Sequence, residues 1–154
     1  MYHDASYHSA SGLPHPEYDA QFYTDVPRRR LIAWVLDAVI IGLLTLIILI
    51  GTLGLAGFIL PIVLIVLSFV YRVQTLRSGS ATLGMRLVGI QLRDRRGLKF
   101  DDATAVLHTA LYTFNTILLP LQLLSCVLMA KSRYGQGLHD MVLGTTAINT
   151  PANY

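Results

Sequence analysis

The sequence predicts an all-α membrane protein, in which a helical hairpin is followed by a third apolar region that is kinked or re-entrant. Residues 31–50 and 55–72 are apolar and separated by two glycines, and about 20 such residues suffice to cross a bilayer. Arginines precede the first stretch and follow the second. Two crossings return the chain to its starting side, so the positive-inside rule gives both flanks, and the N-terminus, a cytoplasmic location.

Composition and charge divide the chain into one membrane domain with short tails. Of its 154 residues, 53% are hydrophobic and 14% charged, which is typical of a small bilayer-embedded unit. Residues 1–26 are polar and aperiodic, and we predict a flexible cytoplasmic tail. Pro27 is suited to opening the first helix. The membrane domain then covers residues 27–149, and residues 150–154 form a C-terminal tail.

A polar insert of residues 73–102 follows the second span, and we expect it to hold a small cytoplasmic β-hairpin. Residues 86–93 are predicted as a strand, followed by a glycine-containing turn and a short return strand over 98–100. Residues 142–148 are rich in β-branched side chains and offer a third strand. Such support is expected because a two-stranded hairpin alone is marginally stable.

The third apolar region, residues 103–130, is too long for a minimal span and too short for two. Asp101 or Asp102 is expected to cap its first helix. Pro120 leaves two alternatives: one long helix kinked there, with the C-terminus on the far side, or a broken re-entrant pair. Basic residues after the region slightly favour the return to the cytoplasm.

Asp37 is an acid inside the first span and needs a partner, since a charge at the bilayer centre costs about 3 kcal/mol on insertion scales. We expect one buried polar cluster, closed at the interface by Arg30 or Arg86. Its members are Asp37, His108, Tyr112 and Asn115. The cluster is either an interhelical clamp or a place where Asp37 and His108 exchange a proton or hold a small cation.

Other chemistry is not expected from these residues. Neighbouring His139 and Asp140 point to different faces of a helix or strand and make a poor metal pair, so no metal or cofactor is predicted. The pattern holds no paired carboxylates or nucleophile motif, and an enzyme is not expected. Cys126 is the only cysteine. Because its sequence neighbours are apolar, we expect Cys126 to pack as a small hydrophobic side chain rather than to act in redox chemistry.

The basic residues of the insert are expected to contact anionic lipid headgroups rather than nucleic acid, because no aromatic residues are interleaved with them. The candidates for this contact are Arg93, Arg95 and Arg96.

Three ordered motifs carry a family resemblance. They are Arg30-x-x-Ala33-x-x-x-Asp37, the run Thr-Leu-Gly-Met-Arg-Leu-Val-Gly over 82–89, and Gln-Gly-Leu-His-Asp-x-x-x-Gly-Thr over 136–145. The chain resembles the RDD family of small bacterial membrane proteins, named for an arginine and two aspartates. The resemblance implies that Arg30, Asp37 and Asp140 are the family residues.

The resemblance also implies a multi-pass protein of the bacterial plasma membrane. Most relatives have no assigned activity, and some are regarded as sodium/proton exchangers. At His108, many relatives carry an arginine instead. We therefore expect a non-enzymatic accessory or interaction subunit of a larger membrane assembly, with lipids and other subunits or further copies as partners. The rival hypothesis is an oligomeric cation/proton exchanger that uses Asp37.

Overall fold

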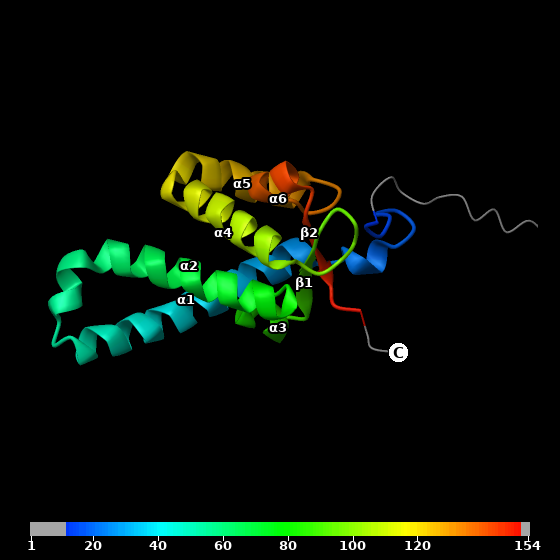
Figure 1. Cartoon of the computed structure of the whole chain (residues 1–154). Coiled ribbons are helices and arrows are strands. Elements are labelled where there is room, and N and C mark those ends of the chain that lie inside the picture. Colours follow the sequence, from blue (N-terminus) through cyan, green and yellow to red (C-terminus); the bar gives the residue numbers. More distant parts are fainter. Residues whose placement is uncertain (1–11, 152–154) are drawn as a thin grey trace, which may run out of the picture.

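The predicted membrane hairpin is present in the computed structural model, which describes residues 12–151. Helix α1 spans Val26–Gly51 and helix α2 spans Leu60–Gly79, with the 3₁₀ helix η2 (Leu55–Ile59) between them. Within the described residues, these two segments are long and apolar enough to cross a membrane. Figure 1 shows α1 and α2 side by side, extending together beyond the rest of the molecule.

The third apolar region forms two helices, α4 (Asp102–Ile117) and α5 (Leu119–Lys131), bent by 116°. Leu118 leaves the helical conformation, and Pro120 lies in the first turn of α5, where its missing N–H costs nothing. The alternative of one long kinked helix is therefore wrong, and α5 folds back beside α4 (Figure 1). Asp101 caps α4 as predicted, since its Oδ1 accepts from the Thr104 N–H at 2.8 Å.

The sheet pairs segments far apart in sequence. Strand β1 (Ile90–Arg93) runs antiparallel to β2 (Thr146–Asn149), with Ile90 opposite Asn149 and Arg93 opposite Thr146. The predicted strand after residue 142 is thus confirmed in its second half. Its first two residues belong to the short helix α6 (Leu138–Leu143), and Gly144 and Thr145 connect this helix to the strand.

The predicted local hairpin is wrong, because residues 98–100 form no strand. The Asp94 carboxylate accepts from the N–H groups of Arg96 and Leu98, and Phe100 donates its N–H to Ser80. These donors are used locally, so the edge of β1 is left for β2. The predicted strand over 86–93 is also shorter, since helix α3 (Leu83–Leu87) takes its first residues.

Residues 12–25, predicted as part of a flexible tail, lie against the sheet end of the molecule. They include the 3₁₀ helix η1 (Ala20–Phe22). Asn149 donates its side-chain N–H to the carbonyls of Gln21 and Thr24 at 2.8 and 3.0 Å, and Gly12 donates to the Arg95 carbonyl. The rest of that predicted tail, residues 1–11, lies outside the described residues, as do residues 152–154 of the C-terminal tail.

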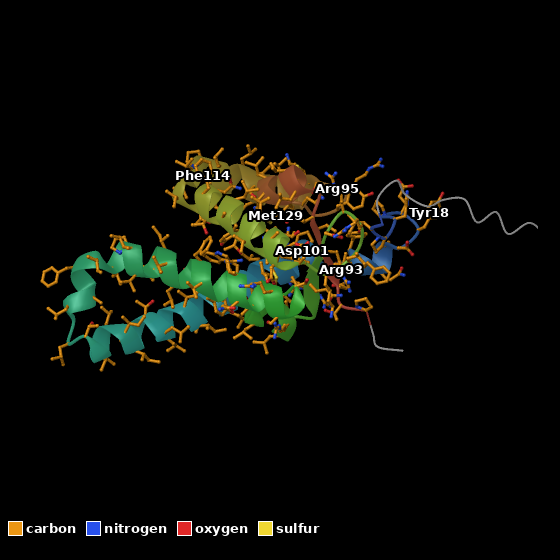
Figure 2. The ribbon with its side chains drawn as sticks, in the orientation of Figure 1. Tyr18, Arg93, Arg95, Asp101, Phe114 and Met129 are labelled. Carbon is orange, nitrogen blue, oxygen red and sulfur yellow. The ribbon has the colours of Figure 1, made fainter. Side chains whose placement is uncertain are left out.

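The hydrophobic core lies where the helices meet the sheet, around Val26, Leu76, Ile90 and Leu92, each at most 1% exposed. At the far end of the hairpin, by contrast, the apolar side chains are exposed. In Figure 2, the labelled Arg93 and Arg95 lie at the sheet end, whereas Phe114 lies at the other end of α4. The buried polar residues around Asp37 and Asp140 lie between these ends.

Candidate functional site

Asp37 is buried, 2% exposed, and its carboxylate accepts three hydrogen bonds. The Tyr71 hydroxyl and the Gly84 N–H donate to Oδ1 at 2.6 and 2.9 Å, and the Thr82 hydroxyl donates to Oδ2 at 2.7 Å. None of these donors is charged. The burial cost of the carboxylate is therefore offset by dipoles, including the N-terminal end of α3.

Side-chain oxygens of Asp37, Tyr71 and Thr82 together bind the first turn of α3. The N–H of Leu83 donates to the Tyr71 hydroxyl at 3.1 Å, and that of Met85 donates to Thr82, the N-cap residue, at 3.2 Å. With the Gly84 bond, three otherwise free N–H groups of the helix are satisfied. Asp37 thus anchors α3 to α1.

Gly84 allows this close approach of α3 to α1. A Cβ atom at this position would lie 2.3 Å from the Ala33 carbonyl oxygen and 2.8 Å from Asp37 Oδ1. Only glycine fits there without moving the two helices apart. The spacing of Ala33 and Asp37 in one motif and Gly84 in the next therefore has a steric cause.

Asp140 is the centre of a second cluster and is fully buried. Its Oδ2 accepts from Arg30 Nη2 at 2.6 Å and from the Gly137 N–H at 3.1 Å. Its Oδ1 lies 2.9 Å from His108 Nε2 and accepts from the Thr145 hydroxyl at 3.0 Å. We call Arg30, His108 and Asp140 the clamp, because they join α1, α4 and α6.

The electrostatics of the clamp keep Asp140 ionised. Burial acts to raise the pKa of Asp140, but the Arg30 charge, together with His139 and His108, lowers it well below its usual value. Burial lowers the pKa of the neighbouring His139 to about 3, against the opposing effect of Asp140. At neutral pH the cluster therefore holds an anionic Asp140 and a neutral His139 ring.

Three buried side chains of this region have metal-ligand atoms within 4.8 Å of one another, namely His108, His139 and Asp140. However, the oxygens of Asp140 already face four partners, which match the lone pairs of a carboxylate. Arg30 also places a positive charge against it. The geometry fits a hydrogen-bonded clamp better than a cation site.

The predicted single cluster is divided in two, because the Asp37 carboxylate bonds to Tyr71, Thr82 and Gly84 and not to His108. His108 and Asp37 lie on different helices whose polar faces meet different segments. Arg86 closes neither group, since it donates to the Ala81 carbonyl and, through Nη2, to the end of α2.

The two remaining predicted members lie elsewhere along α4. Tyr112 accepts a hydrogen bond from Trp34 Nε1 at 3.2 Å, and its ring lies 3.8 Å from the Arg72 guanidinium carbon. Asn115 is buried, and its Nδ2 has no partner among the described residues. Tyr71, Thr82 and Thr145 were not predicted as site residues, although two family motifs contain Thr82 and Thr145. Only the packing of distant segments brings their hydroxyls to the two aspartates.

The three basic residues expected at lipid headgroups differ in exposure. Arg95 and Arg96 are exposed, and Arg96 pairs with Asp94 at 2.9 Å. Arg93 is half-buried and donates to the Gly97 carbonyl at 3.4 Å. Only Arg95 and Arg96 are thus placed to meet a headgroup at the surface.

A family model described as the RDD family matches residues 25–144. The chain belongs to the RDD family. The matched residues include both acid centres and the helices that position them. No curated protein and no solved structure matches the chain significantly.

In this RDD-family protein, the arginine and the two aspartates that the resemblance singles out do not form one site. Arg30 pairs with Asp140 across 110 residues of sequence, whereas Asp37 is satisfied by uncharged donors. The two aspartates therefore have separate roles: Asp37 holds the insert through α3, and Asp140 holds the C-terminal segment on α1.

Proposed function

We propose that this RDD-family protein is a non-enzymatic integral membrane protein that acts as an accessory or interaction subunit of a larger membrane assembly. The observation that carries the proposal is the uncovered far end of the α1–α2 hairpin. There Ile47, Leu53 and Phe58 are 65%, 93% and 89% exposed, and α4 and α5 end before reaching them (Figure 1). An apolar surface of this kind fits lipid or another membrane helix.

The polar interior supports a structural role for the acids. Buried polar groups in a membrane protein stabilise the packing of helices when each has an internal partner, and both aspartates have such partners. The proposed orientation places the N-terminus, the insert and the sheet in the cytoplasm at the plasma membrane. The arginines gathered at the sheet end, including Arg93 and Arg95 (Figure 2), support this orientation.

The test is photo-crosslinking in the native membrane, with a photoreactive residue replacing Ile47 on the hairpin. A matched control position is Leu124 on α5, which is 47% exposed. We expect a discrete protein adduct from Ile47 and none from Leu124. An adduct with twice the mass of the chain identifies a second copy as the partner. Adducts with lipid alone would contradict the interaction role.

The second candidate function is a cation/proton exchanger, and the observation in its favour is that Asp37 lines two cavities within the helix bundle. Proteoliposomes loaded with a pH-sensitive dye test it. We expect no sodium-dependent proton flux. Flux that Asp37→Asn abolishes, while the control Asp102→Asn retains it, would replace the accessory role by exchange. Tyr71→Phe, which keeps the carboxylate, would then shift the pH dependence of the flux.

A further inference from the structure

A second arginine, Arg72 of α2, is as buried as Arg30 but has no counter-ion. It is 7% exposed, and its guanidinium lies 3.8 Å from the centre of the Tyr112 ring. Among the described residues, the Arg72 side chain makes no hydrogen bond or ion pair. The Arg30 side chain, by comparison, bonds both a carbonyl and a carboxylate.

An uncompensated guanidinium in such a place calls for an anion. A buried charge is ordinarily paired or hydrogen-bonded, because the loss of hydration costs several kcal/mol per ion. Stacking on an aromatic face recovers only about 2 kcal/mol when both groups are desolvated. The five N–H donors of the guanidinium suit the paired oxygens of a phosphate.

Arg72 lies at the junction of two cavities. The first, of about 250 Å³, lies between α1, α4 and α5 and is also lined by His139 and Gln122. The second, of about 360 Å³, lies between α1, α2 and α4. Arg72, Tyr112, Trp34 and Asp37 line both, so the cavities meet at the guanidinium.

Both cavities are lined mainly by apolar surface, but ionisable side chains are more numerous in the first than in the second. In the first cavity, His139 Nδ1 and Gln122 Oε1 are buried without a partner among the described residues. The amide oxygen of Gln122 only accepts, so it suits a hydroxyl of the headgroup rather than the phosphate itself. The second cavity shares Asp37 and Arg72 with the first but is otherwise lined by uncharged side chains, among them Ile41, Leu64 and Ile65. One end of the combined space therefore suits a polar head and the other a hydrocarbon chain.

The depth of Arg72 agrees with this division. It lies seven residues before the end of α2, about 10 Å along the helix axis, and this end carries the exposed basic residues. Lipid phosphates lie at such a boundary between headgroups and acyl chains. A free anion would satisfy the charge but would leave the aliphatic cavity without an apolar occupant.

We propose that these two cavities bind one anionic phospholipid, with its phosphate on Arg72 and an acyl chain between α1, α2 and α4. Arg30 and His108 of the clamp also line the first cavity, whereas the surface arginines of the insert line neither cavity. The proposal holds whether or not the protein is an accessory subunit, because it depends only on the packing of these helices.

Trp34 makes the site directly measurable, since it is the only tryptophan of the chain and lines both cavities. The full-length protein in dodecyl maltoside is titrated with phosphatidylglycerol that carries brominated acyl chains, which quench tryptophan fluorescence on contact. We expect saturable quenching. Arg72→Gln should raise the half-saturating lipid concentration at least tenfold. The matched control, Arg77→Gln, removes the same charge from the exposed end of the same helix and should leave it unchanged.

Gly42→Leu tests the acyl-chain cavity independently of the charge. Gly42 lines that cavity, and a Cβ there meets no atom within 4 Å, so a side chain can start there without a clash and reduces the space left for an acyl chain. We expect the half-saturating lipid concentration to rise at least tenfold in this variant as well. This variant also keeps the proposal falsifiable if Arg72→Gln does not fold.

Three results would overturn the proposal. The first is equal quenching by brominated diacylglycerol, which lacks the phosphate. The second is unchanged half-saturation in both Arg72→Gln and Gly42→Leu. The third is displacement of the lipid by millimolar inorganic phosphate as effectively as by unlabelled phosphatidylglycerol, which would assign Arg72 to a free anion.

Discussion

Arg30 and Arg72 are two arginines with nearly equal burial and opposite surroundings. Arg30, 8% exposed, meets the carboxylate of Asp140 at 2.6 Å, whereas Arg72, 7% exposed, meets only an aromatic ring. Arg30 faces the returning C-terminal segment, which brings both an acid and a carbonyl. Arg72 faces the space between α1 and α4, where no segment enters. Burial alone therefore does not distinguish a structural charge from one available to a ligand.

His139 lies between the two arginine environments. Its ring packs edge-on against His108, at a centroid distance of 4.8 Å, and against Tyr112, at 5.5 Å. The clamp and the lipid site thus share one aromatic wall. Changes in one are expected to reach the other through this ring, and four perturbations separate their contributions.

The largest expected effect comes from breaking the clamp with Arg30→Gln. Removing one partner leaves the Asp140 carboxylate buried and uncompensated, which typically costs about 3–5 kcal/mol. Thermal unfolding in detergent measures the loss. Arg77→Gln, which breaks the exposed pair with Asp102, is the control and should melt like the parent protein. Equal melting of the two variants would show that Arg30 is not a structural charge.

Gly84→Ala tests whether α3 keeps Asp37 in place beside the Arg72 cavities. The added Cβ would lie 2.3 Å from the Ala33 carbonyl oxygen, and overpacking of this kind costs about 1–3 kcal/mol. Gly42→Ala, in open space on α1, is the matched control and should be neutral or slightly stabilising. A stable Gly84→Ala protein would refute the close approach of α3 and α1.

Acidification should lower the free energy of unfolding, because His139, whose ring lies between the environments of the two arginines, is buried in its neutral form. Since burial lowers the pKa of His139 to about 3 from an unfolded value of 6.5, the unfolded chain binds the extra proton between these values. Stability is thus retained above pH 6.5 and lost as the pH falls, by about 1.4 kcal/mol per unit. Unfolding measured between pH 7.5 and 5 avoids the range in which Asp140 titrates.

His139→Phe is the control for this pH dependence, because it keeps an aromatic ring and removes the titrating group. We expect the stability of the variant to change less than that of the parent over the same range. An identical slope in both proteins would assign the pH dependence to another group.

The smallest effect on stability is expected for Arg72→Gln. No carboxylate loses an ion-pair partner, and the guanidinium no longer has to be desolvated, so the change should stay within about 1 kcal/mol. The same melting assay, with Arg30→Gln alongside, measures it. A loss as large as that of Arg30→Gln would show that Arg72 has a structural partner and would remove the contrast between the two arginines.

Several local features follow from the sequence because their causes are local. The hairpin is determined by two long apolar runs and their basic flanks. The start of α4 is determined by a capping acid, and the break before α5 by Pro120 and its inability to continue a helix. The RDD resemblance likewise depends on short motifs that are read directly.

Non-local pairing was predicted only in part: residues 142–148 were offered as an added strand, and their second half does pair with β1. The sequence predicted a strand partner for β1 within the same insert, but Asp94 and Ser80 take the N–H groups that such a strand needs. The polar residues Asp37 and His108 were expected together from equal depth in the membrane. Equal depth fixes position along a helix but not the direction in which its polar face points.

The sequence by itself determined which two segments are long and apolar enough to span a membrane, which charged residues interrupt them, and to which family the protein belongs. Only the tertiary structure decided how those charges are divided: Arg30 with Asp140, Asp37 with α3, and Arg72 beside two cavities. The physical reason is that hydropathy and caps act over a few residues, whereas ion pairing depends on which distant segments the packing of helices brings within hydrogen-bond distance.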